Sequence, residues 1–152
     1  MRIYLGGDHR GFRLKEVVRL RLSRAGNVVV DLGARRIVPD DDYVDYAVRV
    51  ALRVNRYPAD RGILVCGSAH GMDIVANRFP GVRSIVGFNA DVVQQGREHE
   101  DANVLSLPAE HISTDEALTM VRIFLETPFS HKTRYERRLA KLSDIKVGRR
   151  LS

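Results

Sequence analysis

The sequence predicts a three-layer α/β fold, with a five-stranded parallel sheet and helices on both faces. Two observations carry the prediction. Short apolar runs typical of strands recur five times along the 152 residues, and helical patterns alternate with them from start to finish. The runs are almost continuously apolar, as in parallel sheets that helices cover on both faces.

The strand and helix signals can be placed one by one. The strands are expected at residues 2–6, 28–32, 63–66, 84–88 and 103–107. Between them, apolar residues recur at spacings of three and four, and glycine or proline follows the pattern where a helix should end. These helices are expected from 12 to 22 before Gly26, from 46 to 54 before Pro58, from Met72 onward, and from 90 to 99.

Two further helices complete the chain. Ser113 and Glu116 are spaced for a capping box, and an amphipathic run follows at 117–125. A last helix after Pro128 carries many basic residues. We therefore expect one domain over residues 1–142, with a Rossmann-like (flavodoxin-like) arrangement, and a basic C-terminal tail at 143–152.

Composition narrows the class of protein. With 25 basic and 19 acidic side chains the formal charge is +6, which is compatible with nucleic acid or with a small anion such as a phosphate. The single cysteine excludes an internal disulfide framework and fits a reducing, cytoplasmic location. No signal-peptide pattern and no apolar run of membrane-spanning length is present, so no membrane partner is expected.

Polar residues with proton-transfer chemistry follow two of the expected strands. Asp8 and His9 come after the first, and Cys66 ends the third. Ligands of such folds bind beyond the carboxyl ends of the strands, so these side chains are expected on one rim. A lone cysteine is by default a small buried hydrophobic residue, and Asp8 can equally serve as a helix cap.

The turn from Gly67 to Gly71 gives Cys66 a chemical context. Its amides open the third helix and can hold an oxyanion, and they are expected to lower the pKa of the adjacent thiol. A thiolate beside such amides suits proton abstraction next to a carbonyl, and it equally suits acyl transfer by a nucleophilic cysteine. The spacing of the residues leaves both chemistries open.

Motifs along most of the chain allow a closer comparison. They are Gly7–Phe12, Val30–Gly33, Asp42–Ala47, Asp60–Ser68, Gly71–Met72, Ala76–Arg78, Pro80–Arg83, Arg97–Leu105, Thr127–Phe129 and the spaced pair Arg134 and Arg138. Together they resemble the B-type ribose-5-phosphate isomerases, a family that includes the galactose-6-phosphate isomerase subunits. The resemblance runs from Met1 to about Leu142.

The resemblance implies roles for the residues on the rim. Cys66 would be the base that moves a proton between C1 and C2 of an open-chain sugar, and Ser68 would stabilise the cis-enediolate with the turn amides. His99 would assist opening of the sugar ring, and Asp8 would hydrogen-bond the same region. His9, Arg134 and Arg138 would bind the phosphate, and Tyr43 would line the sugar site. The remaining residues expected to bind substrate are Gly67, Ala69, His70, Gly71 and Asn103.

Several of these residues have a plain structural alternative. His99 can interact with a helix dipole, and Tyr43 can belong to ordinary packing. Arg134 and Arg138 are four residues apart, which also suits a solvated helix face. Asn103 begins a strand and can anchor a loop.

The chain departs from the family pattern in the catalytic turn. Ala69 stands at a position where glycine is common, and we expect the amide seat to survive only if its φ is negative. His70 replaces an aliphatic residue, and it can pair with Cys66, contact the sugar or point outward. Tyr135 stands where histidine is usual after Arg134.

The expected function is interconversion of ribose 5-phosphate and ribulose 5-phosphate. The resemblance implies no metal and no cofactor, and a homodimer or tetramer whose chains share the active site. The alternatives are an isomerase of a six-carbon sugar phosphate, such as allose or galactose 6-phosphate, and a non-catalytic module that binds a phosphorylated ligand or nucleic acid. Nucleic acid is not the favoured partner.

Overall fold

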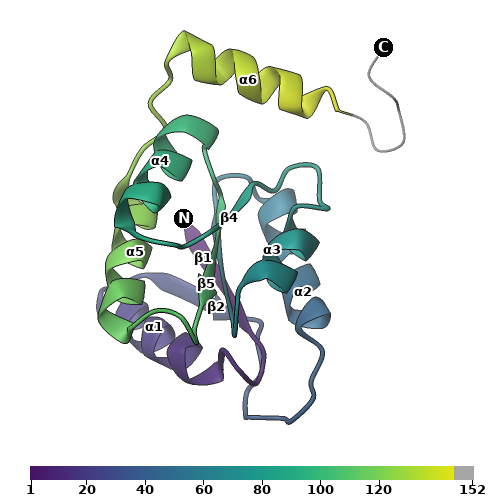
Figure 1. Ribbon diagram of the computed structural model, residues 1–152, viewed down its shortest axis with the longest axis vertical. Coiled ribbons are helices and arrows are strands. Elements are labelled where there is room, and N and C mark those ends of the chain that lie inside the picture. Colours follow the sequence, from purple (N-terminus) through teal and green to yellow (C-terminus); the bar gives the residue numbers. More distant parts are fainter. Residues whose placement is uncertain (146–152) are drawn as a thin grey trace.

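The computed structural model describes residues 1–145 and confirms the α/β fold with a five-stranded parallel sheet (Figure 1). The strands are β1 (Arg2–Gly7), β2 (Val28–Asp31), β3 (Arg61–Cys66), β4 (Ser84–Val86) and β5 (Val104–Pro108). They lie side by side in the order β2-β1-β3-β5-β4, and all neighbouring pairs are parallel. β1 and β3 are therefore adjacent, so the residues that follow them meet at the carboxyl edge of the sheet.

Six helices accompany the sheet. They are α1 (Phe12–Arg24), α2 (Tyr43–Arg56), α3 (His70–Ala76), α4 (Ala90–Glu100), α5 (Thr114–Glu126) and α6 (Thr133–Ser143). Figure 1 shows α1, α4 and α5 on one face of the sheet and α2 and α3 on the other. Each face has its own hydrophobic core, because side chains alternate along a strand between the two faces. On β3, Val65 faces α1 and α5, and Cys66 faces α2 and α3.

Local sequence signals explain several helix ends. Ser113 and Glu116 form the predicted capping box at the start of α5. Gly26, which ends the predicted first helix, has φ +82°, a conformation that favours glycine. α2 begins three residues before its expected start, because the Asp42 carboxylate accepts a hydrogen bond from the Val44 amide at 3.0 Å. β4 ends at Val86, two residues earlier than predicted.

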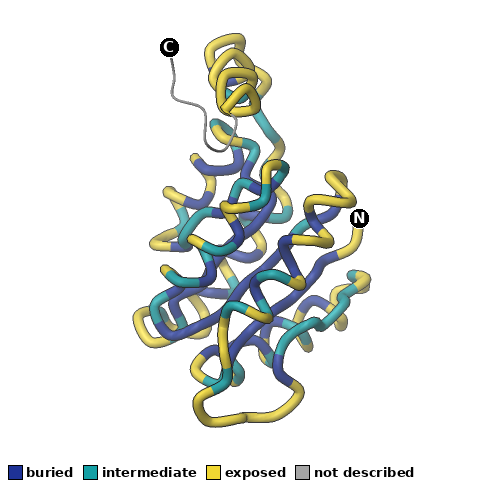
Figure 2. Tube along the Cα trace, turned by 90° about the vertical axis from the view of Figure 1, so that its right-hand side faces the viewer, coloured by how far each residue is buried: buried dark blue, intermediate teal, exposed yellow. Residues whose placement is uncertain are grey.

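Helix α6 projects from one end of the molecule, next to α4 and away from the sheet (Figure 1). Figure 2 shows it almost wholly exposed. Among its described side chains only Tyr135 is buried. The predicted basic tail begins at the last residue of α6, and its residues from 146 onward lie outside the described part. Within residues 1–145, none of the helices combines the length and apolar character of a membrane span.

Candidate active site

The Cys66 thiol lies at the carboxyl end of β3, below the Gly67–Gly71 turn. The Ala69 amide donates a hydrogen bond to Cys66 Sγ at 3.1 Å, so the turn folds back over the thiol. The side chain of Ser68 is partly exposed, whereas Gly67 and Ala69 are buried. The structure thus brings the predicted thiol, hydroxyl and turn amides together on one rim.

The prediction of a lowered thiol pKa is wrong. Burial raises the pKa of Cys66, and the nearby Asp8 carboxylate raises it further. The amides of Ala69, Met72 and Ser68 act in the opposite direction but do not reverse the shift. Cys66 is only 6% exposed, and the helix that follows has seven residues, so desolvation outweighs the helix terminus.

Ala69 adopts the left-handed conformation that its side chain disfavours. Its φ is +67°, so the expectation that the turn would form only with a negative φ at this residue is also wrong. The neighbouring Gly71 leaves room for Tyr43, since a Cβ there would stand 2.6 Å from Cε2 and Cζ of the tyrosine ring. Tyr43, the first residue of α2, therefore lies against the Gly67–Gly71 turn.

Asp8 occupies the loop between β1 and α1, and it is 4% exposed. Its Oδ1 accepts a hydrogen bond from the Gly11 amide at 2.8 Å, directly before α1, so it does hold the start of the helix. Burial raises the pKa of its carboxyl group above the ordinary value. The same carboxylate acts on the pKa of Cys66, so capping and a place on the rim occur together.

His9 is held by a carboxylate that sequence reasoning missed. Nδ1 of His9 lies 2.6 Å from Oδ1 of Asp41, and the same oxygen accepts the His9 amide at 3.0 Å. The hydrogen bond to Asp41 raises the pKa of the imidazole. The run of acidic residues at 40–42 is the signal that could have suggested such a partner. His9 is therefore favoured as a cation, which suits an anionic ligand.

His70 is exposed as the first residue of α3. Within the described chain no hydrogen bond joins its ring to Cys66. Burial raises the pKa of Asp73, which lies on the same helix, and the nearby His70 opposes this shift only in part. Of the predicted alternatives, the structure favours a side chain that points outward.

The other predicted residues gather around Tyr135 in a separate group, which we call the Tyr135 cluster. The His99 ring stacks on the Tyr135 ring at a centroid distance of 4.3 Å. Arg134 donates to the Tyr135 hydroxyl at 2.6 Å, and the Arg134 and Arg138 guanidinium groups lie 4.6 and 5.9 Å from the centre of the ring. α4 and α6 thus place one imidazole and two guanidinium groups around a single aromatic ring.

The Tyr135 cluster lies at the opposite end of the sheet from Cys66. α4 ends just before β5 begins, so His99 is close to the amino edge, whereas Cys66 pairs with Pro108 at the carboxyl end of β5. Figure 1 shows the same separation: α6 lies at one end, and the loop between β2 and α2, which contains Asp41, lies at the other. One chain therefore holds the predicted residues as two groups.

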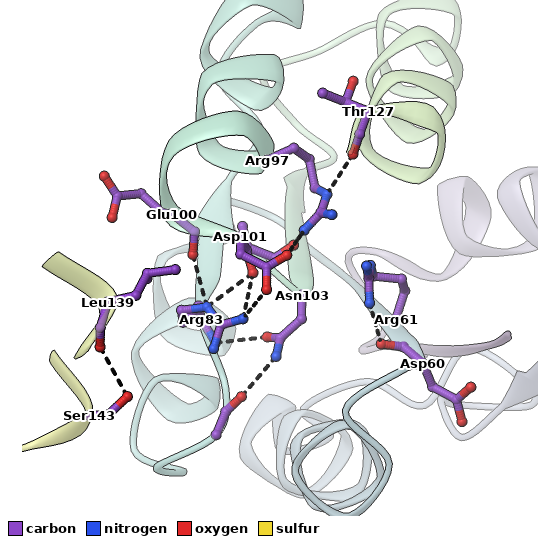
Figure 3. A network of polar contacts seen from close by, with 12 residues as sticks. Asp60, Arg61, Arg83, Arg97, Glu100, Asp101, Asn103, Thr127, Leu139 and Ser143 are labelled. Carbon is purple, nitrogen blue, oxygen red and sulfur yellow. Dashed lines mark hydrogen bonds and ion pairs between the residues drawn. The ribbon is translucent and has the colours of Figure 1, made fainter. Parts of the chain in front are cut away.

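A polar network lies at the end of α4, the helix that carries His99 (Figure 3). Asp101, with φ +44°, accepts hydrogen bonds from Arg97 at 2.9 Å and from Arg83 at 2.8 Å. The buried Asn103 side chain accepts from the Arg83 amide at 2.8 Å and donates to the Gly81 carbonyl at 2.8 Å. Asn103 thus anchors the loop before β4, which is the structural alternative to a contact with substrate, and it lies far from Cys66.

No metal site is evident in the part of the chain that the structure describes. None of its groups of three or more histidine, cysteine, aspartate or glutamate side chains is arranged to hold a metal ion. The side chains around Cys66 are instead suited to proton transfer and anion binding.

Fold and site together define an open parallel α/β protein with a thiol, a carboxyl group and an imidazole on one rim. Comparison with known proteins agrees. Residues 3–142 match the Ribose/Galactose Isomerase family, and the chain belongs to that family. It is 35% identical to ribose-5-phosphate isomerase B of Mycolicibacterium paratuberculosis over 144 residues, which cover 95% of this chain and 91% of the relative.

Solved structures show the same likeness. Ribose-5-phosphate isomerase B of Clostridium thermocellum superposes with a TM-score of 0.90 at 35% identity, covering 95% of this chain and 96% of the other. The Mycoplasma genitalium enzyme with bound ribulose-5-phosphate also has a TM-score of 0.90, at 33% identity and 93% coverage of both chains.

Proposed function

We propose that this protein interconverts ribose 5-phosphate and ribulose 5-phosphate, with Cys66 as the base. The observation that carries the proposal is the position of the thiol. It ends β3 beneath an amide-lined turn, with Asp8 on the same rim, in a chain of the ribose/galactose isomerase family. Relatives over nearly the whole chain bear the name of this activity, which favours a five-carbon substrate over a six-carbon one.

The reaction moves one proton from C2 to C1 of the open-chain sugar and one from O2 to O1. Cys66, as thiolate, takes the C2 proton, and the resulting thiol returns it to C1. The negative charge of the enediolate then forms beside the Gly67–Gly71 amides and the Ser68 hydroxyl, which stabilise it. A base with a raised pKa is a strong acceptor for a carbon-bound proton, although less of it is ionised at neutral pH.

We assign His99, Arg134 and Arg138 to the active site of a second copy of the chain. They lie at the opposite end of the sheet from Cys66, so the site is incomplete without a partner. α6 is suited to this role because it projects from the molecule with little of its surface covered. In the proposed dimer, His99 of one chain assists ring opening, and its two arginines hold the phosphate beside Cys66 of the other. Arginine suits this role because its planar fork meets phosphate oxygens in two places.

The test of the catalytic role is turnover of ribose 5-phosphate by the wild-type protein and by Cys66→Ala. We expect isomerisation in the first and none above background in the second, with inorganic phosphate still bound by both. Allose 6-phosphate, assayed in parallel, should be the poorer substrate by kcat/KM. Activity that survives in Cys66→Ala would assign the base to another group.

The shared site has its own test. Cys66→Ala and His99→Ala chains, each inactive alone, are mixed and allowed to exchange subunits. Random pairing makes half of the dimers mixed, and each mixed dimer holds one intact site of two, so about one quarter of wild-type activity should return. No recovery after exchange has been verified would mean that each chain uses its own His99.

A further inference from the structure

Arg10 lies on the rim of the Cys66 site, next to His9, and has no role in the mechanism above. Its guanidinium is held by Glu110, which follows β5: Nε donates to Oε1 at 2.6 Å, and Nη2 donates to Oε2. β3 lies between β1 and β5, so this pair closes over the end of the strand that carries Cys66.

The guanidinium rests directly on Gly67. A Cβ on this glycine would stand 2.6 Å from both Cζ and Nε of Arg10, so the arginine fills the space that a side chain would take. The Glu110 amide also donates to the Gly67 carbonyl at 3.1 Å. Arg10 is therefore fixed at two points, by the Glu110 carboxylate and by contact with the catalytic turn.

The position of Arg10 relative to the thiol suggests which part of a ligand it meets. Cys66 faces the α2 and α3 side of the sheet, and the Arg10 guanidinium crosses the strand end at Gly67, the residue that follows the thiol. Arg10 thus lies across the strand end from the reacting thiol. That place suits the end of an open-chain sugar that is remote from C1 and C2, which is where the phosphate is.

The guanidinium also has donors to spare. Two of its five N–H groups bond Glu110, and the other three have no hydrogen-bond acceptor among residues 1–145. The side chain is 51% exposed, so these donors are open to a ligand from solution. Charge-assisted hydrogen bonds from arginine to phosphate are among the stronger polar contacts in proteins.

We propose that Arg10 binds the substrate phosphate from the same chain as Cys66, beside His9, with Glu110 holding the fork in place. The identity of the sugar rests on the proposed function, but the affinity for phosphate does not. Because Arg10 and Cys66 belong to the same chain, each chain can hold the phosphate of its substrate before the arginines of a partner complete the site.

The test compares Arg10→Ala with Arg24→Ala, which removes the same charge from the far end of α1. In Arg10→Ala, KM for ribose 5-phosphate and the inhibition constant of inorganic phosphate should rise together by about tenfold, at the lower end expected for a charged hydrogen bond. The value of kcat should change little, and Arg24→Ala should resemble the wild type in both constants.

Any result in which Arg10→Ala loses no affinity for phosphate would overturn the proposal. A lower kcat and lower thermal stability, with unchanged phosphate inhibition, would mean that Arg10 only clamps the turn. If the wild-type protein does not isomerise the sugar, the proposed function fails, and calorimetric titration with inorganic phosphate still decides the role of Arg10. Loss of phosphate binding in Arg10→Ala but not in Arg24→Ala supports the proposed role of Arg10. Equal binding of phosphate by the two variants, or no binding by the wild type, refutes that role.

Discussion

Ala69 gives the sharpest test of the conformation of the catalytic turn. Its φ of +67° costs an alanine about 1–2 kcal/mol, which Ala69→Gly would recover. Two losses of stability oppose that gain. Glycine has more conformational freedom in the unfolded chain, which costs about 0.4–1 kcal/mol, and removal of the buried methyl group costs about 0.8 kcal/mol. The net change in unfolding free energy should therefore lie within about 0.8 kcal/mol of zero.

Ala51→Gly is the matched control, because Ala51 is equally buried but lies in the middle of α2. There glycine costs about 1 kcal/mol in helix propensity and about 0.8 kcal/mol in lost burial, with no strain to recover. At about 2–4 °C per kcal/mol, Tm should change by no more than about 3 °C in Ala69→Gly and fall by about 4–7 °C in Ala51→Gly.

Calorimetry of the two variants, with isomerase activity measured alongside, checks this reasoning. Ala69→Gly should retain activity, because the amide at position 69 keeps its hydrogen bond to Cys66 Sγ. Equal falls in Tm for the two variants would show that Ala69 is not strained, and the account of the turn would be wrong.

Three further predictions concern charge. The hydrogen bond to Asp41 raises the pKa of His9, which is a cation below that pKa, so phosphate binding should weaken as pH rises through it. In Asp41→Asn this loss should occur at lower pH. KM, measured from pH 5.5 to 8, should therefore rise roughly two- to tenfold near pH 7–8 and change little near pH 5.5. Because burial raises the pKa of Cys66, kcat should climb from neutral into alkaline pH, and Asp8→Asn should move this rise to lower pH. A kcat–pH profile that does not move in Asp8→Asn would show that Asp8 does not act on the thiol. Lys15 has no exposed surface, and its Nζ lies 2.5 Å from Asp31 and 2.6 Å from Glu16, so Lys15→Met should lower the unfolding free energy by about 2 kcal/mol. A loss below about 1 kcal/mol in a urea melt would contradict the burial argument.

Most of the fold could be predicted because its signals are local. Apolar runs, glycine at helix ends and the Ser113 capping box each depend on a few neighbouring residues. The same holds for Asp8 and Cys66, which parallel topology brings to one edge of the sheet. The bounds of α2 and β4 shifted by two or three residues, since they depend on one capping bond and on where a short strand stops pairing.

Other features depend on contacts that no local pattern encodes. Arg10 and Glu110 are 100 positions apart, and Asp41 reaches His9 from a long loop. The thiol pKa went in the opposite direction from the prediction because burial depends on the packed whole, whereas the helix terminus can be read locally. The division of His99 and Cys66 between two ends of the sheet follows from the parallel strand direction, because α4 leads into the amino end of β5, whereas Cys66 ends β3.

The most direct test of the central claim follows ribose 5-phosphate by NMR in D2O with the wild-type protein and with Cys66→Ala. If the thiol moves the proton between C2 and C1, the wild type should form ribulose 5-phosphate that carries solvent deuterium at C1, and the variant should form neither product nor label. Label that appears at an unchanged rate in Cys66→Ala would contradict the assignment of Cys66 as the base.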